Sequence, residues 1–247
     1  MITISKPLAI PQILESKGKA ENTINCRRKS RNPLSTIVIK SSIYGHTSVK
    51  KILKKAQYNK CCFCEKEQVD EFGAVEHFRP KNGYKSHKVQ KLLRPGYYWL
   101  GYNWENLFFV CNACNGAGNK GNLFPLVDES TRAKSHIDNI AMETPKLLDP
   151  SGRKNPRNHI SFVDEIPKSL SIYGKKTIEI CGLDRDPLNE MRRKLISDID
   201  ARIAILSLGI HSQDTIDKAK SFIKNVQMPQ AEFSAMATDY ITRFFIL

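Results

Sequence analysis

Apolar residues recur at helical spacing in the segment 44–60, just ahead of the cysteine-rich middle of the chain. They lie three or four residues apart, with lysines on the opposite face, at Val49, Ile52, Leu53 and Ala56. This spacing is typical of a helix that buries one face. We therefore expect a short amphipathic helix that leads into the first cysteine motif.

The C-terminal part shows the same periodicity over a longer stretch. A helix is predicted to begin at Pro187, which suits a first helical turn, with Asp186 as its N-cap. Its apolar positions are Leu188, Met191, Leu195, Ile199 and Ile203. Further helices are predicted at about 213–226 and 229–246. The region 128–247 is therefore expected to be mainly helical and to bind substrate or a partner.

Two short runs fit strands, and the N-terminal segment fits neither helix nor strand. Residues 159–163 are expected to form one strand, and a second is expected near 170–172. Residues 1–43 carry prolines at positions 7, 11 and 33 and a basic cluster at 27–31, so we expect an extended basic arm. With a compact module at 44–127, the chain is predicted to be an α+β protein.

Composition and charge narrow the functional classes. The chain of 247 residues is 40% hydrophobic and 26% charged, which is typical of a soluble globular protein. Its 39 Lys plus Arg against 25 Asp plus Glu give a formal charge of +14, which favours a polyanionic partner, nucleic acid first. No apolar run or signal-like start is evident, so we expect a cytoplasmic protein without a membrane partner.

Cysteine spacing points to a metal site rather than to disulfides. Four of the seven cysteines form two Cys-x-x-Cys motifs, Cys61 with Cys64 and Cys111 with Cys114. Zn²⁺ prefers four tetrahedral ligands, and two such turns supply four thiolates. We predict a structural zinc site that closes the long segment between the motifs; Cys26, Cys62 and Cys181 are expected to stay outside it.

Residues with catalytic chemistry lie between and directly after these motifs. Glu76 and His77 are adjacent, Asn106 follows an aromatic run, and Asn115 comes directly after the last cysteine. A Glu-His pair alone means little. On a strand the two side chains point to opposite sides unless the strand bends. Because the pair lies between the two halves of a predicted metal site, we treat Glu76 and His77 as candidate catalytic residues.

The order of these motifs resembles a known family. Cys-x-x-Cys, Glu-His-Phe-Arg-Pro, Trp-Glu-Asn-Leu and Cys-x-x-Cys-Asn occur in the order of the zinc-supported HNH (ββα-metal) endonucleases. The fuller strings VEHFRPK, GYYWLGYNWENLFFVC and CNGAGNKGNLFP resemble the branch found as the HNH subunit (PtuB-like) of Septu-type and retron-associated anti-phage systems. The specific match spans about 45–127, with a looser one to about 200.

The resemblance implies a role for each candidate. His77 falls at the general base, and Glu76 falls where most members have an aspartate that binds the catalytic ion. Asn115 falls at the second protein ligand, and Asn106 at the residue that aims the histidine. These oxygen ligands suit Mg²⁺ or Mn²⁺ better than zinc. The implied reaction is metal-assisted phosphodiester hydrolysis, in which the zinc takes no chemical part.

Three cations near this pair are candidate contacts to nucleic acid. Arg79 and Lys81 follow the Glu-His pair, and Lys120 lies in the Gly- and Asn-rich segment after the second cysteine motif. We expect Arg79 and Lys120 to hold the scissile phosphate and Lys81 to contact nucleic acid, although solvated surface cations would look the same in sequence. The aromatic stripe at 97–109 is expected to be core rather than a base-stacking surface.

The resemblance also implies partners. Members of this branch work beside an SMC/ABC-type ATPase (PtuA-like) and, in retron-associated systems, with a reverse transcriptase and its RNA–DNA product. This sequence contains no G-x-x-x-x-G-K-[ST] motif, so ATP control would come from another chain. As the substrate we expect DNA before RNA. The alternatives are a zinc-stabilised nucleic-acid-binding module and a structural subunit without catalysis of its own.

Overall fold

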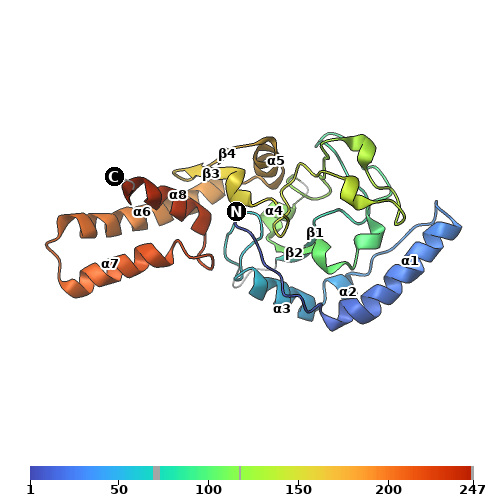
Figure 1. Ribbon diagram of the computed structural model, residues 1–247, viewed down its shortest axis with the longest axis horizontal. Helices are drawn as coiled ribbons and strands as arrows, with labels where there is room; N and C mark the ends of the chain where they lie inside the picture. Colours follow the sequence, from blue (N-terminus) through green and yellow to red (C-terminus); the bar gives the residue numbers. More distant parts are fainter. Residues whose placement is uncertain (69–72, 117, 246–247) are drawn as a thin grey trace.

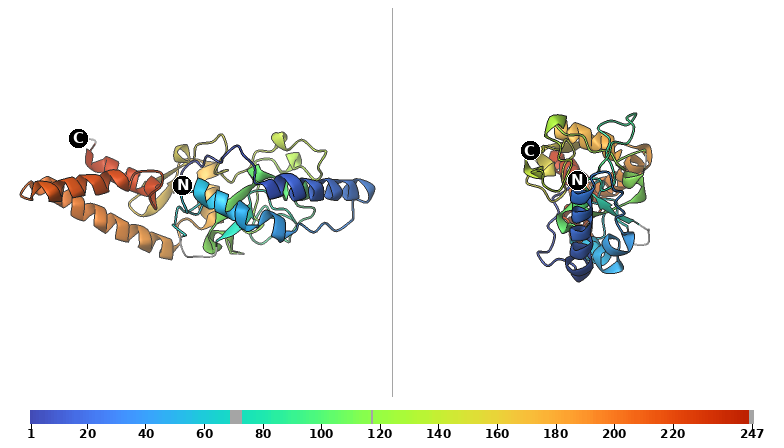
Figure 2. Two further views of the ribbon diagram at one scale, coloured as in Figure 1. Left: turned by 90° about the horizontal axis from the view of Figure 1, so that it is seen from below. Right: turned by 90° about the vertical axis from the view of Figure 1, so that its right-hand side faces the viewer.

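The computed structural model describes residues 1–68, 73–116 and 118–245 and combines helices with two small sheets. Helix accounts for about 46% of the chain. The molecule is elongated: α1 (Lys19–Arg31) lies at one end and the pair α6 (Asp186–Leu208) and α7 (Gln213–Asn225) at the other (Figures 1 and 2). The mixed helix and sheet content agrees with the predicted fold class.

The centre of the molecule is an antiparallel pair of strands followed by a short helix. β1 (Ala74–His77) pairs with β2 (Leu107–Val110), with Glu76 opposite Phe108 and His77 opposite Leu107. The helix α4 (Asn112–Asn115) follows β2 directly and contacts β1. Every residue of β2 is buried. The aromatic stripe therefore forms core around the hairpin, as predicted.

The predicted helix in 44–60 is confirmed as α3 (Thr47–Ala56). His46 caps its first turn by accepting a hydrogen bond from the Ser48 amide at its Nδ1, 3.2 Å away. Val49 and Leu53 are fully buried, while Ile52 is partly buried against the same core. The apolar face packs against β1 and β2, so α3 holds the first cysteine motif beside the hairpin.

The N-terminal segment differs from the expected extended arm. It contains a π-helical turn (Leu14–Gly18) that continues into α1, and a short helix α2 (Ser41–Tyr44) follows. The prolines lie before and after these helices, where they do no harm to helical hydrogen bonds. The basic cluster forms the last turn of α1, where cations interact favourably with the helix dipole. The arm is therefore largely helical and packed on the core.

The small second sheet lies close to its predicted place. β3 (Ile160–Val163) confirms the first strand, but its partner β4 is Ile166–Ser169, earlier than predicted, because Asp164 turns the chain back at a positive φ of 53°. A helix that the pattern missed, α5 (Ile172–Cys181), begins where the second strand was expected. Gly182 ends α5 in the left-handed conformation with φ 57°.

The C-terminal helices are confirmed, with shifted starts. α6 has Pro187 in its first turn, but Arg185 rather than Asp186 is the N-cap. α7 matches the prediction, and α8 (Ser234–Phe245) begins later than predicted because Phe233 takes a left-handed φ of 52°. The predicted division of the chain into domains at residues 43 and 127 stays a prediction. One continuous cluster of buried apolar residues contains side chains from all three predicted parts.

Within the described residues, no helix is both long enough and apolar enough to cross a bilayer.

Candidate active site and metal centre

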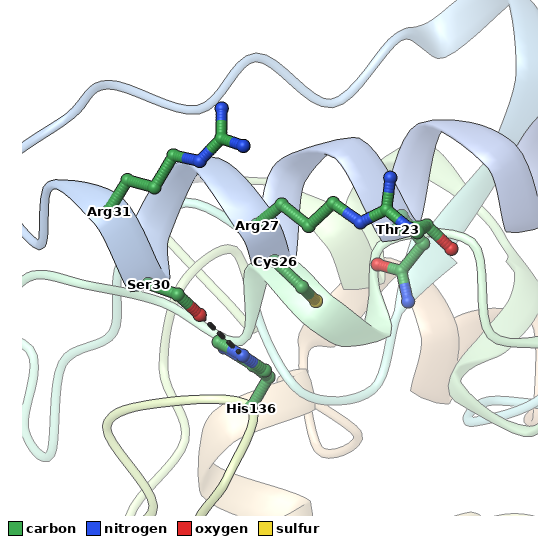
Figure 3. Close-up of a pocket in the computed structure, with 7 residues that line it drawn as sticks. Thr23, Cys26, Arg27, Ser30, Arg31 and His136 are labelled. Atoms are coloured by element: carbon green, nitrogen blue, oxygen red, sulfur yellow. Dashed lines mark hydrogen bonds between the residues drawn. The ribbon is translucent and has the colours of Figure 1, made fainter.

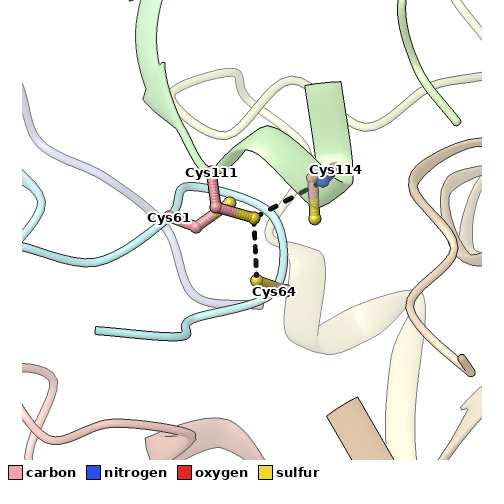
Figure 4. Close-up of side chains that lie close together, drawn as sticks. All are labelled: Cys61, Cys64, Cys111 and Cys114. Atoms are coloured by element: carbon pink, nitrogen blue, oxygen red, sulfur yellow. Dashed lines mark hydrogen bonds between the residues drawn. The ribbon is translucent and has the colours of Figure 1, made fainter. Parts of the chain in front are cut away.

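The two cysteine motifs meet beside the hairpin. Cys61 and Cys64 lie in the turn after α3, Cys111 caps α4, and Cys114 lies within it (Figure 4). All four are buried, and their sulfur atoms lie within 4.8 Å of one another, with Cys64 and Cys111 3.8 Å apart. A tetrahedral zinc ion with Zn–S bonds of about 2.3 Å needs sulfurs roughly 3.8 Å apart. The four cysteines can therefore hold a metal such as zinc.

The remaining cysteines lie outside this group, as predicted. Cys62 and Cys181 are buried, and burial raises the pKa of both thiols well above the usual value, so both stay protonated. Arg185 donates a hydrogen bond from Nη1 to the sulfur of Cys114 at 3.5 Å. This guanidinium offsets part of the negative charge that four thiolates bring to a Zn²⁺ site.

A small open pocket brings together the three residues proposed for the chemistry. It has a volume of about 120 Å³, and its walls are Glu76, His77, Pro80, Lys81, Asn82, Asn115, Gly121 and Asn122. Glu76 and His77 come from β1 and Asn115 from the end of α4. The strand ends at His77 and the chain bends at the next two residues, which lets neighbouring side chains line one pocket.

The hydrogen bonds of His77 select one tautomer. Its Nε2 lies 2.9 Å from the carbonyl oxygen of Gly101, and its Nδ1 lies 3.4 Å from Nζ of Lys81. A carbonyl only accepts and an ammonium only donates, so the proton lies on Nε2, and the Nδ1 lone pair faces the Lys81 ammonium. Burial and the nearby charges of Lys81 and Lys120 lower the pKa of His77 well below its usual value. The neutral imidazole can accept a proton at Nδ1.

Lys120 lies behind the pocket rather than in it. Its side chain has no exposed surface, and its ammonium donates to Glu76 Oε1 at 2.9 Å and to the His77 carbonyl at 2.7 Å. This differs from the expected phosphate contact, because the cation is buried against the protein. Among the described residues, Glu76 Oε2 has no hydrogen-bond partner. Lys120 thus fixes one oxygen of the Glu76 carboxylate and leaves the other without a partner among the described residues.

Replacing Lys120 by methionine is expected to destabilise the protein. The substitution keeps a side chain of similar length but removes the cation that pairs with the Glu76 carboxylate. The Glu76 side chain is only 15% exposed, so little water can replace that cation. The free energy of unfolding should fall by about 2–3 kcal/mol. Urea denaturation measures this difference. The matched control is Lys88→Met at an exposed position, which should change little; equal stability of the two variants would contradict the assigned role.

The other two predicted nucleic-acid contacts, Lys81 and Arg79, line different pockets. Lys81 lines the pocket of His77. Arg79 instead donates from Nε to Glu143 Oε2 at 2.9 Å and lines a separate pocket of about 420 Å³. Glu143 also accepts from the Tyr97 hydroxyl at 2.7 Å. The structure therefore brings Lys81, but not Arg79, to the predicted catalytic residues.

Asn106 connects the backbone on both sides of His77. The buried amide accepts from the Arg79 amide at 2.7 Å and donates to the carbonyls of Arg79, at 3.1 Å, and Leu100, at 3.2 Å. Arg79 follows the end of β1, and Leu100 precedes Gly101, whose carbonyl holds His77. The contacts are those that a residue aiming the histidine would make.

Gly101 positions His77 through its carbonyl oxygen, and the sequence patterns did not single it out. Its contribution is a carbonyl oxygen, which carries no side-chain signal. A Cβ at this position would lie 2.8 Å from Cγ2 of Ile39, so the close approach requires glycine. A glycine within the aromatic run at 97–104 was the one available hint.

Comparison with known proteins finds similarity to Septu proteins. The chain is 35% identical over 195 residues to Septu protein PtuB of Bacillus mycoides (strain KBAB4), which covers 74% of the chain and 65% of that relative. Identity to a Septu protein PtuB of Bacillus thuringiensis is 27% over 147 residues, covering 59% of the chain and 44% of the relative. No family model matches the chain.

A further similarity is to a protein with another name. The chain is 24% identical over 161 residues to Septu protein PtuA of Bacillus mycoides (strain KBAB4), which covers 65% of the chain but 22% of that protein. The chain thus spans about two thirds of one curated relative and less of the others. The chain is thus similar to two proteins named Septu protein PtuB, and each similarity extends over more than half of the chain.

Proposed function

We propose that the chain is a metal-dependent HNH endonuclease that acts in a Septu-type anti-phage defence complex. The observation that carries the proposal is the pocket in which a neutral histidine, a carboxylate and an amide from β1 and α4 meet. The order of strand, strand and helix beside four clustered cysteines is that expected of a ββα-metal module. The sequence similarity to Septu protein PtuB supports the defence assignment.

The donor set fits a hard divalent cation. Glu76 Oε2 and the side-chain oxygen of Asn115 would hold Mg²⁺ or Mn²⁺, which prefer oxygen ligands. When bound, such an ion stabilises the negative charge that develops on the phosphate and leaving oxygen. The four thiolates would hold a softer ion such as zinc and stabilise the β1–β2 hairpin without taking part in the reaction.

His77 acts as the general base. Nδ1 takes a proton from the attacking water, and the Gly101 carbonyl holds Nε2–H so that the imidazole keeps its tautomer and orientation. The carbonyl dipole also stabilises the imidazolium that forms. Lys81, whose ammonium lies beside Nδ1 in this structure, is placed to turn toward a non-bridging phosphate oxygen.

The proposed complex contains a PtuA-like ATPase and nucleic acid. The formal charge of +14 suits a polyanionic substrate, for which we propose DNA before RNA. ATP control is assigned to the partner chain because this sequence has no phosphate-binding loop motif. Association with a retron stays a prediction of the family resemblance.

Substitution of Glu76 by glutamine tests the metal role. The neutral amide keeps the shape of the side chain but weakens a Mg²⁺ or Mn²⁺ ligand, so cleavage should require a higher Mn²⁺ concentration and fall by about 10²-fold at low Mn²⁺. Cleavage of plasmid DNA and of tRNA is followed across a Mn²⁺ titration, with the chain alone and with a PtuA-like ATPase. Glu190→Gln on the exposed face of α6 is the control. An unchanged Mn²⁺ dependence would exclude Glu76 as a ligand.

A further inference from the structure

A larger groove adjoins the catalytic pocket. It has a volume of about 480 Å³ and is called here the α1 groove. Its walls come from the end of α1, the segment after it and the loop around the Arg94–Pro95 bond: Lys29, Pro33, Leu34, Ser35, Thr36, Ile37, Lys81, Asn82, Arg94, Pro95, Gly96 and Tyr98. Lys81 and Asn82 also line the pocket of His77. The two depressions therefore lie next to each other and share these two residues.

The α1 groove is cationic. Lys29, Lys81 and Arg94 line it, and none of its lining residues is acidic. Lys29 donates to the Pro33 carbonyl at 2.7 Å, and Arg94 donates to the Asn82 carbonyl at 3.0 Å. Within the described part of the chain, none of the three forms an ion pair with a carboxylate. Their charges are thus available to an anionic ligand.

The groove also has apolar lining residues, and hydrogen bonds hold one of its walls in place. Leu34 is 92% exposed, and Pro33, Ile37 and Pro95 line the groove beside it. Ser30, next to Lys29 on α1, lies 3.3 Å from Nε2 of His136 (Figure 3). Nδ1 of the same histidine lies 2.7 Å from the Tyr98 hydroxyl. This bridge ties α1 to Tyr98 in the groove wall. Cations beside apolar side chains suit a ligand that alternates phosphates with sugars and bases.

We propose that the α1 groove binds the nucleic-acid strand next to the scissile phosphate. The inference rests on the proposed endonuclease, because the strand runs from the pocket of His77 across Lys81 into the groove. Lys29 and Arg94 contact the phosphates that follow the cleavage site, and the apolar wall contacts their sugars and bases. The helical N-terminal segment thus acts as one side of a substrate channel.

A salt titration of binding tests the proposal without requiring catalysis. Fluorescence anisotropy of a labelled DNA strand, single or duplex, is measured in EDTA with the full chain and with the double variant Lys29→Ala/Arg94→Ala. Loss of two phosphate contacts should weaken binding about tenfold and reduce the slope of log affinity against log salt by roughly 1.4–1.8. The variant Lys29→Arg/Arg94→Lys should retain both values.

The control removes the same charge at the opposite end of the molecule. Lys220→Ala/Lys224→Ala changes exposed residues of α7. The proposal would be overturned if the α1-groove variant and the α7 variant had the same affinity and the same salt slope. It would also be overturned if the unsubstituted chain did not bind the DNA. Equal melting temperatures of the variants exclude misfolding as the cause.

A second measurement separates failure of the groove from failure of the proposed nuclease. Bis(4-nitrophenyl) phosphate is a diester small enough to occupy the catalytic pocket alone. In Mn²⁺, cleavage of DNA by the α1-groove variant should fall at least tenfold more than hydrolysis of this small diester. Equal losses on both substrates would overturn the groove. If the unsubstituted chain hydrolyses neither substrate, even together with a PtuA-like ATPase, the nuclease is rejected, and the binding titration then decides the groove.

Discussion

Replacement of His77 by alanine is expected to lower the rate of nucleic-acid cleavage by about 10²- to 10⁴-fold. The variant loses the Nδ1 lone pair that takes the proton from water, while the four cysteines and the α1 groove are unchanged. Zinc content and affinity for nucleic acid should therefore stay at their unsubstituted values. Single-turnover cleavage in Mn²⁺ measures the rate, and atomic spectrometry measures zinc.

Two further variants make this result specific. His77→Gln retains an N–H group that can donate to the Gly101 carbonyl but has no basic nitrogen, so it should fold and remain inactive. His87→Ala removes an exposed histidine from the basic loop and should cleave at the normal rate. Cleavage by His77→Gln at the rate of His87→Ala would show that His77 only supports the fold.

Removal of the metal from the cysteine site is expected to unfold the central hairpin. The site joins the turn after α3 to α4, and its four side chains form part of the buried core. Structural zinc sites contribute about 10–16 kcal/mol of apparent binding free energy in small domains, more than the stability of a typical domain. Cys64→Ala should therefore lose zinc and the cooperative thermal transition.

The neighbouring cysteine provides the control for this prediction. Cys62 is buried next to the site but lies outside the sulfur cluster, so Cys62→Ala should retain zinc and melt cooperatively. Zinc content is measured by atomic spectrometry and melting by circular dichroism. A Cys64→Ala protein that melts like Cys62→Ala would show that the cysteines are ordinary core residues.

Features with a strong local signal were predictable from the sequence. The spacing of the cysteines predicted which four come together, and apolar periodicity predicted α3 and α6. The family resemblance implied that Glu76, His77 and Asn115 share a site; all three line one pocket, and their roles stay predictions. In each case the residues that carry the signal are close in sequence, or the geometry of one metal site requires them to come together.

Features that depend on tertiary contacts were not predictable. α1 has few apolar residues and lies between prolines, so its pattern favoured an extended arm, although packing against the turn Tyr98–Leu100 stabilises a helix. Lys120 and Arg79 are ordinary cations in sequence. Their carboxylate partners, Glu76 and Glu143, are distant along the chain. Only the fold shows that Lys120 is internal and that Arg79 lines a pocket separate from that of His77.

The most direct test of the account is cleavage of nucleic acid by the purified chain together with a PtuA-like ATPase. Plasmid DNA and tRNA are incubated with the unsubstituted chain in Mn²⁺, with the same chain in EDTA, and with His77→Ala in Mn²⁺. The account predicts phosphodiester cleavage in the first reaction only. Cleavage that persists in EDTA or in the His77→Ala protein, or no cleavage by the unsubstituted complex in Mn²⁺, would contradict it.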